Sequence, residues 1–424
     1  MLLGRLWRNR EGGVAPMLAL AALPVMGFVG AAIDFGRAAS VRTAMQTALD
    51  STALALSKEA QGLSATDLSQ KANDFFLANF SRPEAHNVQI THQLTAPQEG
   101  SFTLKITGSG TVDPVFTKLL GQTQISFSAS TEVLWGIKRL NIALVLDNTG
   151  SMASSAKMTN LKLAAHNLLT TLKNAAKKPD DVFVSIVPFA VDVNVGTSNV
   201  AATWIDWTDW EAANGTCSNT YYKTKSSCTS AGKVWTPKSH SFWNGCVNDR
   251  DQNNDVTNTA PAGGAATKFR AHQADNCPVA MMPLSNDWVA LNAKIAAMTP
   301  TGNTNVTIGL AWGFQLLSPV APFNAPAPAP DLDKVIVILT DGDNTQNRWS
   351  SSSTSIDART KKVCDNIKEQ NILLYTVRVI DGNGTLLKNC ATKPSMYYDV
   401  DQAIELTSVF GSIAQNLANL RIAK

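Results

Sequence analysis

The chain has 424 residues, of which 44% are hydrophobic and 16% are charged, so it carries enough apolar side chains to bury a sizeable core. This length exceeds that of one ordinary domain, and two or three structural units are expected. The 36 basic residues are nearly balanced by 33 acidic ones, which gives a net charge of +3. That balance excludes an extended polyanion-binding surface, so no nucleic acid partner is expected.

The N-terminal region contains an uncharged stretch of 20 residues, Val14 to Ile33. A helix of this length spans about 30 Å, the thickness of a bilayer core. Three arginines precede it, so the positive-inside rule places residues 1–13 in the cytoplasm and the rest of the chain across the membrane. A signal peptide cut at Gly30-Ala31-Ala32 is the alternative. A retained anchor is favoured because the apolar run is long and helix-compatible sequence continues past it.

Residues 34–136 are predicted to form a small α+β unit. Apolar residues recur every three or four positions after the anchor, so the helix should continue to about Ala60 with one buried stripe: Val41, Met45, Leu49, Ala53 and Leu56. A second helix is expected over Thr66 to Phe80. Three strand-like runs follow, at Val88 to Thr91, Phe102 to Ile106 and Gln124 to Val133.

Residues 139–424 have a different pattern, in which apolar strands alternate with helices. The expected strands are Leu140 to Leu146, Val182 to Ala190, Val335 to Thr340 and Ile372 to Val379. Because these runs lack polar alternation, the strands should be buried on both faces, as in a parallel sheet covered by helices. The expected helices are Ala156 to Ala176, Asp287 to Met298, Asn305 to Ser318, Ile356 to Gln370 and Asp401 to Ala418. The predicted fold is a doubly wound α/β domain.

A segment of about residues 196–283 interrupts this alternation. It is rich in Asn, Thr, Ser and Trp and holds four of the six cysteines, which indicates an insertion held by disulfides. The pairs Cys217–Cys228 and Cys246–Cys277 are favoured, although four cysteines allow three connectivities. An even number of cysteines in the second half of the chain fits an oxidising compartment. Free thiols and zinc ligands are the alternatives, and no C-x-x-C pair supports zinc.

Two weaker signals lie inside this insertion. Five tryptophans fall between Trp204 and Trp243, where they could bind a carbohydrate, but filling a small core is the favoured interpretation. The alternating acids Asp249, Asp251 and Asp255 have the pattern of a calcium loop without its glycine and final ligand. A solvated polar loop is the favoured interpretation there.

Three polar segments are expected beyond the carboxyl ends of the predicted strands, where ligands bind in open parallel sheets. They supply two carboxylates and three hydroxyls: Asp147, Thr149, Ser151, Thr304 and Asp341. Such hard oxygen donors suit Mg²⁺, with Mn²⁺ or Ca²⁺ as alternatives. The competing interpretation is that the first loop merely caps a helix and the last merely forms a turn.

The same residues resemble a known metal site. D-x-T-x-S at Asp147 to Ser151, G-x-T at Gly302 to Thr304 and T-D-G at Thr340 to Gly342 resemble the metal-ion-dependent adhesion site of von Willebrand A domains, where serine is more usual than Thr149. The resemblance implies that the bound metal accepts an Asp or Glu from a protein partner. No histidine lies in the three segments and no nucleophile–base pair is apparent, so an enzyme is not expected.

Longer motifs resemble the TadG-type proteins of the tight-adherence pilus machinery. They are GGVAPMLALAALPVMGFVGAAIDFGR, MQTALDSTALALS, FTKLLG, WNGCVNDR, LTDGDNTQNRW and VCDNIK followed by LLKNCAT. The resemblance implies a single-pass protein of the bacterial inner membrane whose periplasmic domain supports assembly or anchoring of adhesive pili. It also implies a pilin or pilus-assembly component as partner, and a disulfide between Cys364 and Cys390. A surface-exposed adhesin and a purely structural envelope component are the alternatives.

Overall fold

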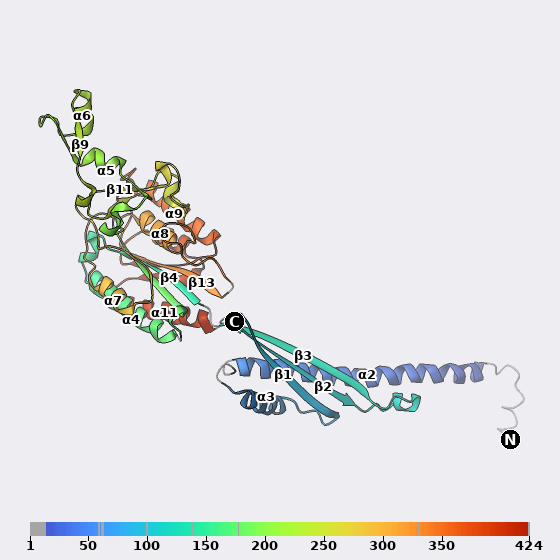
Figure 1. Ribbon diagram of the computed structural model, residues 1–424. Coiled ribbons are helices and arrows are strands. Elements are labelled where there is room, and N and C mark those ends of the chain that lie inside the picture. Colours follow the sequence, from blue (N-terminus) through green and yellow to red (C-terminus); the bar gives the residue numbers. More distant parts are fainter. Residues whose placement is uncertain are drawn as a thin grey trace, which may run out of the picture. The chain divides into compact units, whose positions relative to one another are not determined.

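A computed structural model describes residues 14–57, 60, 63–98, 101–136, 139–176, 178–329 and 331–422. The predicted cytoplasmic tail, residues 1–13, lies outside the described residues. The chain divides into two compact units, the first ending at Gly136 and the second running from Ile137 to Ala423 (Figure 1).

The first unit packs one long helix on an antiparallel sheet. Its elements are α2 (Val14–Ser57), α3 (Ala65–Asn79), β1 (Ala85–Gln98), β2 (Ser101–Val112), the short 3₁₀ helix η2 (Thr117–Leu120) and β3 (Ile125–Gly136). The strands pair in the order β1-β2-β3, and the side chains of the predicted stripe on α2 are fully buried. All three strands are longer than predicted. Backbone pairing of β1 and β2 continues through mainly polar residues, and β3 continues to Gly136.

The second unit is a mixed α/β fold built on a mainly parallel sheet, as predicted. Five strands run parallel in the order β15-β14-β13-β4-β5, and β12 pairs with β5 in the antiparallel sense. Their bounds are β4 (Arg139–Asp147), β5 (Val182–Phe189), β12 (Met282–Ser285), β13 (Leu332–Thr340), β14 (Leu373–Val379) and β15 (Tyr397–Val400). Two of these strands were not predicted from the sequence, β12 and β15, which are four residues long and lie at sheet edges.

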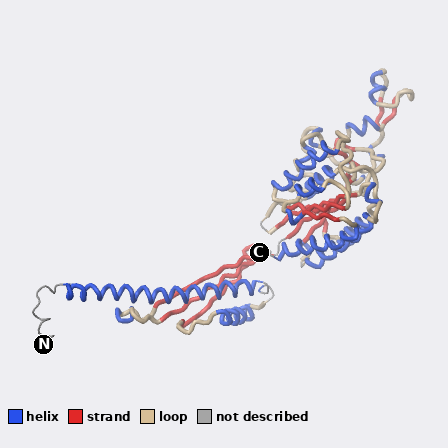
Figure 2. The backbone as a smooth tube through the Cα atoms, turned by 180° about the vertical axis from the view of Figure 1, so that it is seen from behind, coloured by secondary structure: helices blue, strands red, loops and turns tan. Residues whose placement is uncertain are grey.

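Helices cover both faces of this sheet, and each face has its own apolar core (Figure 2). One face carries α4 (Lys157–Ala175), α7 (Trp288–Ala296) and α11 (Leu406–Ile422). The other carries α8 (Val306–Leu316), α9 (Ser353–Glu369) and α10 (Gly384–Cys390). The last helix begins five residues later than predicted, because Ala403–Glu405 form a separate 3₁₀ turn.

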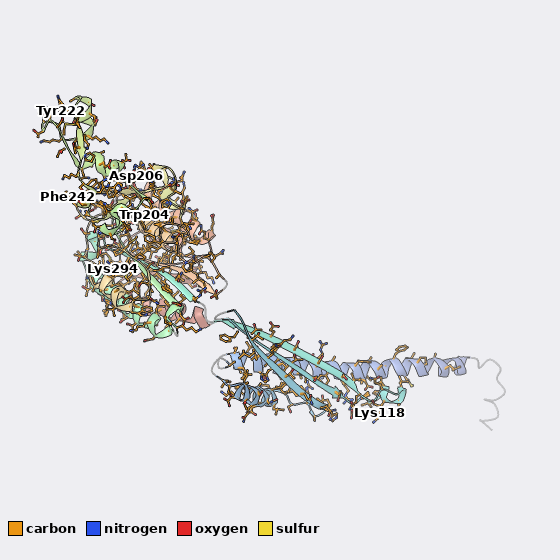
Figure 3. The ribbon with its side chains drawn as sticks, in the orientation of Figure 1. Lys118, Trp204, Asp206, Tyr222, Phe242 and Lys294 are labelled. Atoms are coloured by element: carbon orange, nitrogen blue, oxygen red, sulfur yellow. A yellow bond between two sulfur atoms is a disulfide. The ribbon has the colours of Figure 1, made fainter. Side chains whose placement is uncertain are left out.

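The insertion extends the sheet and carries a small lobe of its own. After β6 (Val193–Asn194), the strands β10 (Cys246–Asn248), β11 (Phe269–Ala271) and β7 (Ile205–Asp206) continue the sheet beyond β5. The lobe contains α5 (Thr208–Ala213), β8 (Gly215–Cys217), α6 (Lys225–Ser230) and β9 (Trp235–Pro237). Trp210 and Trp243 are buried, so these tryptophans fill a core as favoured (Figure 3 labels Trp204 of the same cluster).

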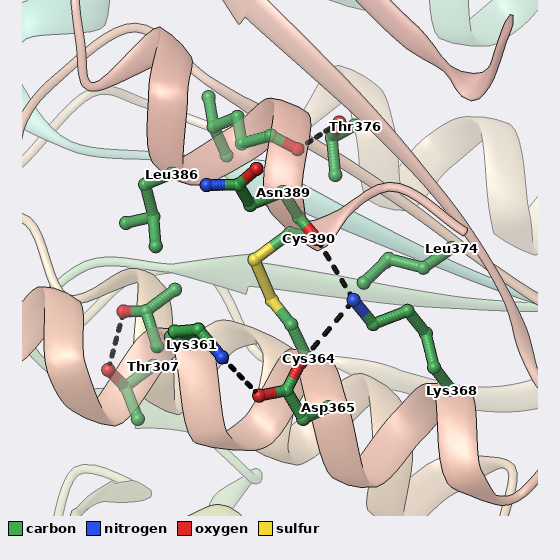
Figure 4. Close-up of a disulfide and its surroundings, with 12 residues drawn as sticks. Thr307, Lys361, Cys364, Asp365, Lys368, Leu374, Thr376, Leu386, Asn389 and Cys390 are labelled. Carbon is green, nitrogen blue, oxygen red and sulfur yellow. Dashed lines mark hydrogen bonds and ion pairs between the residues drawn. A yellow bond between two sulfur atoms is a disulfide. The ribbon is translucent and has the colours of Figure 1, made fainter. Parts of the chain in front are cut away.

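All six cysteines are paired. The bonds are Cys217–Cys228, Cys246–Cys277 and Cys364–Cys390, the pairings that the sequence favoured. The first two hold the insertion, and the third joins α9 to α10 on one face of the parallel sheet (Figure 4).

Candidate metal centre

The two predicted carboxylates lie at the ends of neighbouring strands. Asp147 is the last residue of β4, and Asp341 directly follows β13, which pairs with β4 in parallel. Parallel strands end at the same edge of a sheet, so both acids reach that edge. The Thr340 hydroxyl donates a hydrogen bond of 2.6 Å to Asp147 Oδ2, which fixes the first carboxylate against the second strand.

The loop after β4 brings two hydroxyls to these acids. The Thr149 hydroxyl donates to Asp147 Oδ1 at 2.5 Å and lies 3.0 Å from Ser151 Oγ. The Ser151 hydroxyl donates in turn to Asp341 Oδ1 at 2.6 Å. Two hydroxyl–carboxylate hydrogen bonds, from Thr149 to Asp147 and from Ser151 to Asp341, therefore gather four of the five predicted oxygen-bearing side chains, and the two hydroxyl oxygens lie in contact.

The third segment packs against the first loop and brings Thr304 to the same place. The backbone N–H of Gly150 donates to the Gly302 carbonyl at 3.0 Å, and that of Thr301 donates to the Asn148 carbonyl at 2.7 Å. A Cβ atom at Gly342 would lie 3.6 Å from both Ser151 Oγ and Thr304 Oγ1. The Thr304 hydroxyl thus faces the same small space as Ser151, and the structure brings all five side chains together.

This arrangement concentrates negative charge in a buried place. Asp147 is fully buried. Burial and the nearby Asp341 charge raise the pKa of Asp147 to about 6, although hydrogen bonds from Thr149 and Thr340 oppose that rise. A divalent cation would offset the repulsion between the two carboxylates, and the donors are all oxygens of the kind that Mg²⁺ prefers. The side chains present therefore fit a magnesium ion.

Two carboxylates are fewer than many protein metal sites use. Within the described ranges, no group of three or more His, Cys, Asp or Glu residues could hold a metal. Hydroxyl groups and water would have to complete the coordination of an ion at this centre. Its affinity would therefore depend on Thr149, Ser151 and Thr304 as well as on the acids.

Lys157 is a site residue that the sequence analysis missed. Its ammonium group lies 2.8 Å from Asp341 Oδ2 and 3.4 Å from Asp381 Oδ2, and its side chain is 4% exposed. Burial lowers the pKa of Lys157. The hydrogen bonds to Asp341 and Asp381 and the charges of these acids raise the pKa by more than burial lowers it, so the net shift is upward. Lys157 thus partly neutralises Asp341. The sequence places Lys157 at the start of α4, six positions after Ser151, and carries no other signal for its role.

The insertion holds the Thr304 segment through a buried acid. Asp249 accepts hydrogen bonds of 3.1 and 3.0 Å from Nδ2 of Asn305, the residue that caps α8 directly after Thr304. It also accepts a bond of 3.1 Å from the backbone N–H of Arg348. Burial raises the pKa of Asp249 to about 6. These hydrogen bonds lower the pKa, and the negative charges of Asp255 and Asp192 add to the rise.

The interpretation of this acidic segment as a solvated loop is wrong. Asp249 and Asp255 are both buried. Asp255 forms an ion pair with Arg359 of α9, and Asp251 pairs with Arg270 and Arg348. Each acid has a basic or amide partner distant in sequence, which the local alternation of acids could not reveal.

A shallow pocket opens beside the Gly302–Thr304 segment. It has a volume of about 240 Å³, and its lining combines Gly302 and Asn303 with loop residues that flank β6 and β11, including Asp192, His272 and Asn276. His272 Nδ1 lies 2.8 Å from Asp192 Oδ1, and this bond raises the pKa of the histidine. The insertion therefore supplies surface directly next to the candidate metal centre.

Comparisons with known proteins identify the N-terminal segment. Residues 12–57 match the family model Tad, described as putative Flp pilus-assembly TadE/G-like. This match confirms the predicted resemblance for residues 12–57. No curated protein is similar enough in sequence to count as a relative.

Several solved structures are similar at low identity. The pilus adhesin SpaC from Lactobacillus rhamnosus GG is 14% identical over 80% of this chain and 35% of its own, with a TM-score of 0.37. The vWF domain of the type V pili tip protein Mfa5 from Porphyromonas gingivalis is 10% identical over 68% of this chain and 97% of its own, with a TM-score of 0.39. Proximal thread matrix protein 1 from the mussel byssus is 12% identical over 66% of this chain and 46% of its own, with a TM-score of 0.34. This chain thus spans less than half of the SpaC and mussel chains.

Proposed function

We propose that the second unit is a von Willebrand A-type domain that binds a protein partner through a magnesium ion. Asp147, Thr149, Ser151, Thr304 and Asp341 would hold the ion. The proposal depends on one observation, the convergence of these five oxygen-bearing side chains from three separate segments at one edge of a parallel sheet.

The donor set favours binding over catalysis. Three of the five donors are neutral hydroxyls, so a bound Mg²⁺ would keep much of its positive charge. The ion would supply a coordination position for a carboxylate oxygen of the partner, an Asp or a Glu. The protein's own side chains hold the ion in place. The adjacent pocket with Asp192 and His272 offers surface that would select among such partners.

The N-terminal segment supports a role in pilus assembly at a membrane. Residues 12–57 match the pilus-assembly family model, and the part of α2 from Leu20 to Ser57 is long and apolar enough to cross a bilayer by length and composition. We infer a single-pass protein of the bacterial inner membrane, with its N-terminus in the cytoplasm and the metal domain in the periplasm. Three disulfides fit that oxidising compartment. The partner would be a pilin or another pilus component.

Retention of pilin subunits on the immobilised full-length protein tests this function. We expect retention in Mg²⁺ and its loss in EDTA. Asp341→Asn should abolish retention, while Asp343→Asn, at an exposed acid two positions later, should leave it unchanged. Equal retention in EDTA and in Mg²⁺ would rule out the metal-dependent mechanism.

A purely structural metal domain is the second candidate. It is favoured by the close approach of Ser151 to Asp341, because an ion held between these two loops would stabilise them without any partner. This candidate predicts that Mg²⁺ raises the melting temperature while retention of pilin is the same with and without the ion.

A further inference from the structure

The loop between β2 and β3 exposes a cluster of apolar side chains. Over six residues, Val115 is 58% exposed, Phe116 45%, Leu119 88% and Leu120 72%. The cluster includes Lys118, which is also exposed and is labelled in Figure 3. Contiguous apolar side chains of this size are unusual on a surface that meets only water. We call residues 115–120 the apolar loop.

The apolar loop is fastened to the anchor helix. The buried carboxylate of Asp34 on α2 accepts hydrogen bonds from the backbone N–H groups of Val115, Phe116 and Thr117 at 2.9, 2.9 and 2.7 Å. It also accepts one from the Thr117 hydroxyl at 3.0 Å. One turn earlier, a Cβ atom at Gly30 would lie 2.5 Å from Cβ of Phe116, so only glycine lets the two segments approach this closely.

These contacts fix the position of the apolar loop along the axis of α2. Gly30 and Asp34 mark the end of the uncharged run from Val14 to Ile33. Gly30 precedes the last residue of that run by three positions, or about 4.5 Å of helix. On the remaining surface of the same turns, apolar side chains such as Phe28 are exposed. Where this helix leaves a bilayer, the apolar loop therefore lies at the lipid surface.

Backbone N–H groups of the apolar loop already have hydrogen-bond partners within the protein. Besides the three N–H groups bound by Asp34, those of Leu119 and Gly121 donate to the carbonyls of Phe116 and Lys118 at 3.2 and 3.1 Å. Amide groups with internal partners cost little to transfer into an apolar environment. The long side chain of Lys118 can place its charge among lipid phosphates while its methylene groups stay with the acyl chains.

We propose that the apolar loop enters the bilayer that α2 crosses, on the side where the helix emerges. Leu119 and Leu120 lie among the acyl chains and Lys118 lies at the phosphates. The loop then forms a second membrane contact that fixes the tilt and rotation of the first unit on the membrane. This inference depends on the proposed anchor role of α2.

Fluorescence quenching in lipid vesicles tests the proposal. Because all six native cysteines are paired, a single introduced cysteine can be labelled with an environment-sensitive fluorophore. The full-length variants are Leu119→Cys in the loop, Phe28→Cys on the anchor, and Leu77→Cys on α3, which is 67% exposed. Each is reconstituted in vesicles of phosphatidylethanolamine and phosphatidylglycerol, with and without a lipid that carries a quencher near its headgroup.

We expect the label at position 119 to lose fluorescence to the same extent as the label at position 28, and the label at position 77 to lose none. Quenching at position 28 with none at position 119 overturns the loop proposal and leaves the anchor intact. A blue-shifted but unquenched label at position 119 also overturns it, because a protein then covers the loop. No quenching at position 28 overturns both the anchor and the loop.

Discussion

Asp147→Asn separates the electrostatic role of this residue from its packing role. The pKa of Asp147 is raised from 3.8 to about 6 by burial and by Asp341. A shift of this size corresponds to a free-energy cost of about 3 kcal/mol for keeping the charged form in the folded protein at neutral pH. Asparagine has the same shape without the charge. The loss of one buried hydrogen-bond acceptor costs about 1–3 kcal/mol. The variant should therefore be more stable than the wild type by up to about 2 kcal/mol when no metal is present.

Magnesium should reverse this order. A ligand present at about 100 times its Kd stabilises the folded state by about 2.7 kcal/mol. The wild type should gain this stability and the asparagine variant should not. Thermal unfolding followed by tryptophan fluorescence is suitable, because eight of the ten tryptophans lie in residues 139–424. Each kcal/mol should shift the melting temperature by about 2–4 °C.

The comparison is a melting curve for each protein in EDTA and in Mg²⁺, with Asp343→Asn as the control for a surface acid. Melting of Asp147→Asn below the wild type by the same margin in both conditions would refute this electrostatic role. That result would mean that Asp147 serves only to hold the loops, and that the pair of acids has no need of a cation.

Three further predictions concern other parts of the molecule. Lys157→Met removes a positive charge beside the candidate ligands, and Mg²⁺ affinity measured by calorimetry should rise by about tenfold or more. The pKa of Asp249 is raised from 3.8 to about 6 in the folded protein. Between pH 3.8 and about pH 6 the folded state therefore keeps a proton that the unfolded state has lost, and the free energy of unfolding should fall as the pH rises through this range. Asp249→Asn should flatten this part of the stability profile measured by denaturant unfolding. Gly30→Ala should displace Phe116 and reduce quenching of a label in the apolar loop, whereas Gly27→Ala, with nothing near its added methyl group, should not.

The features that the sequence predicted best are those with a local signature. The central strands are nearly continuous apolar runs, and residues that follow such runs in a parallel sheet meet at one edge whatever the details of packing. Asp147 and Asp341 could therefore be placed near each other, although 194 positions separate them. The stripe on α2 was predictable for a similar reason, because its helical period is set by burial on one face.

The features that the sequence did not reveal depend on partners from distant segments. Lys157 gains its role only from the close approach of Asp341, and Asp249 and Asp255 are buried only because Asn305 and Arg359 meet them. A charged residue is normally exposed, so a solvated loop was the reasonable expectation. The short edge strands β12 and β15 were missed because four residues carry too little periodicity.

Binding of Mn²⁺ to the full-length protein, followed by electron paramagnetic resonance, tests the central claim most directly. Mn²⁺ takes the same oxygen ligands as Mg²⁺ and its free-ion signal disappears on binding. We expect one ion bound per chain in the wild type, and loss of that binding when Thr149→Val and Ser151→Ala are combined. A free-ion signal that the wild-type protein leaves unchanged would contradict this expectation.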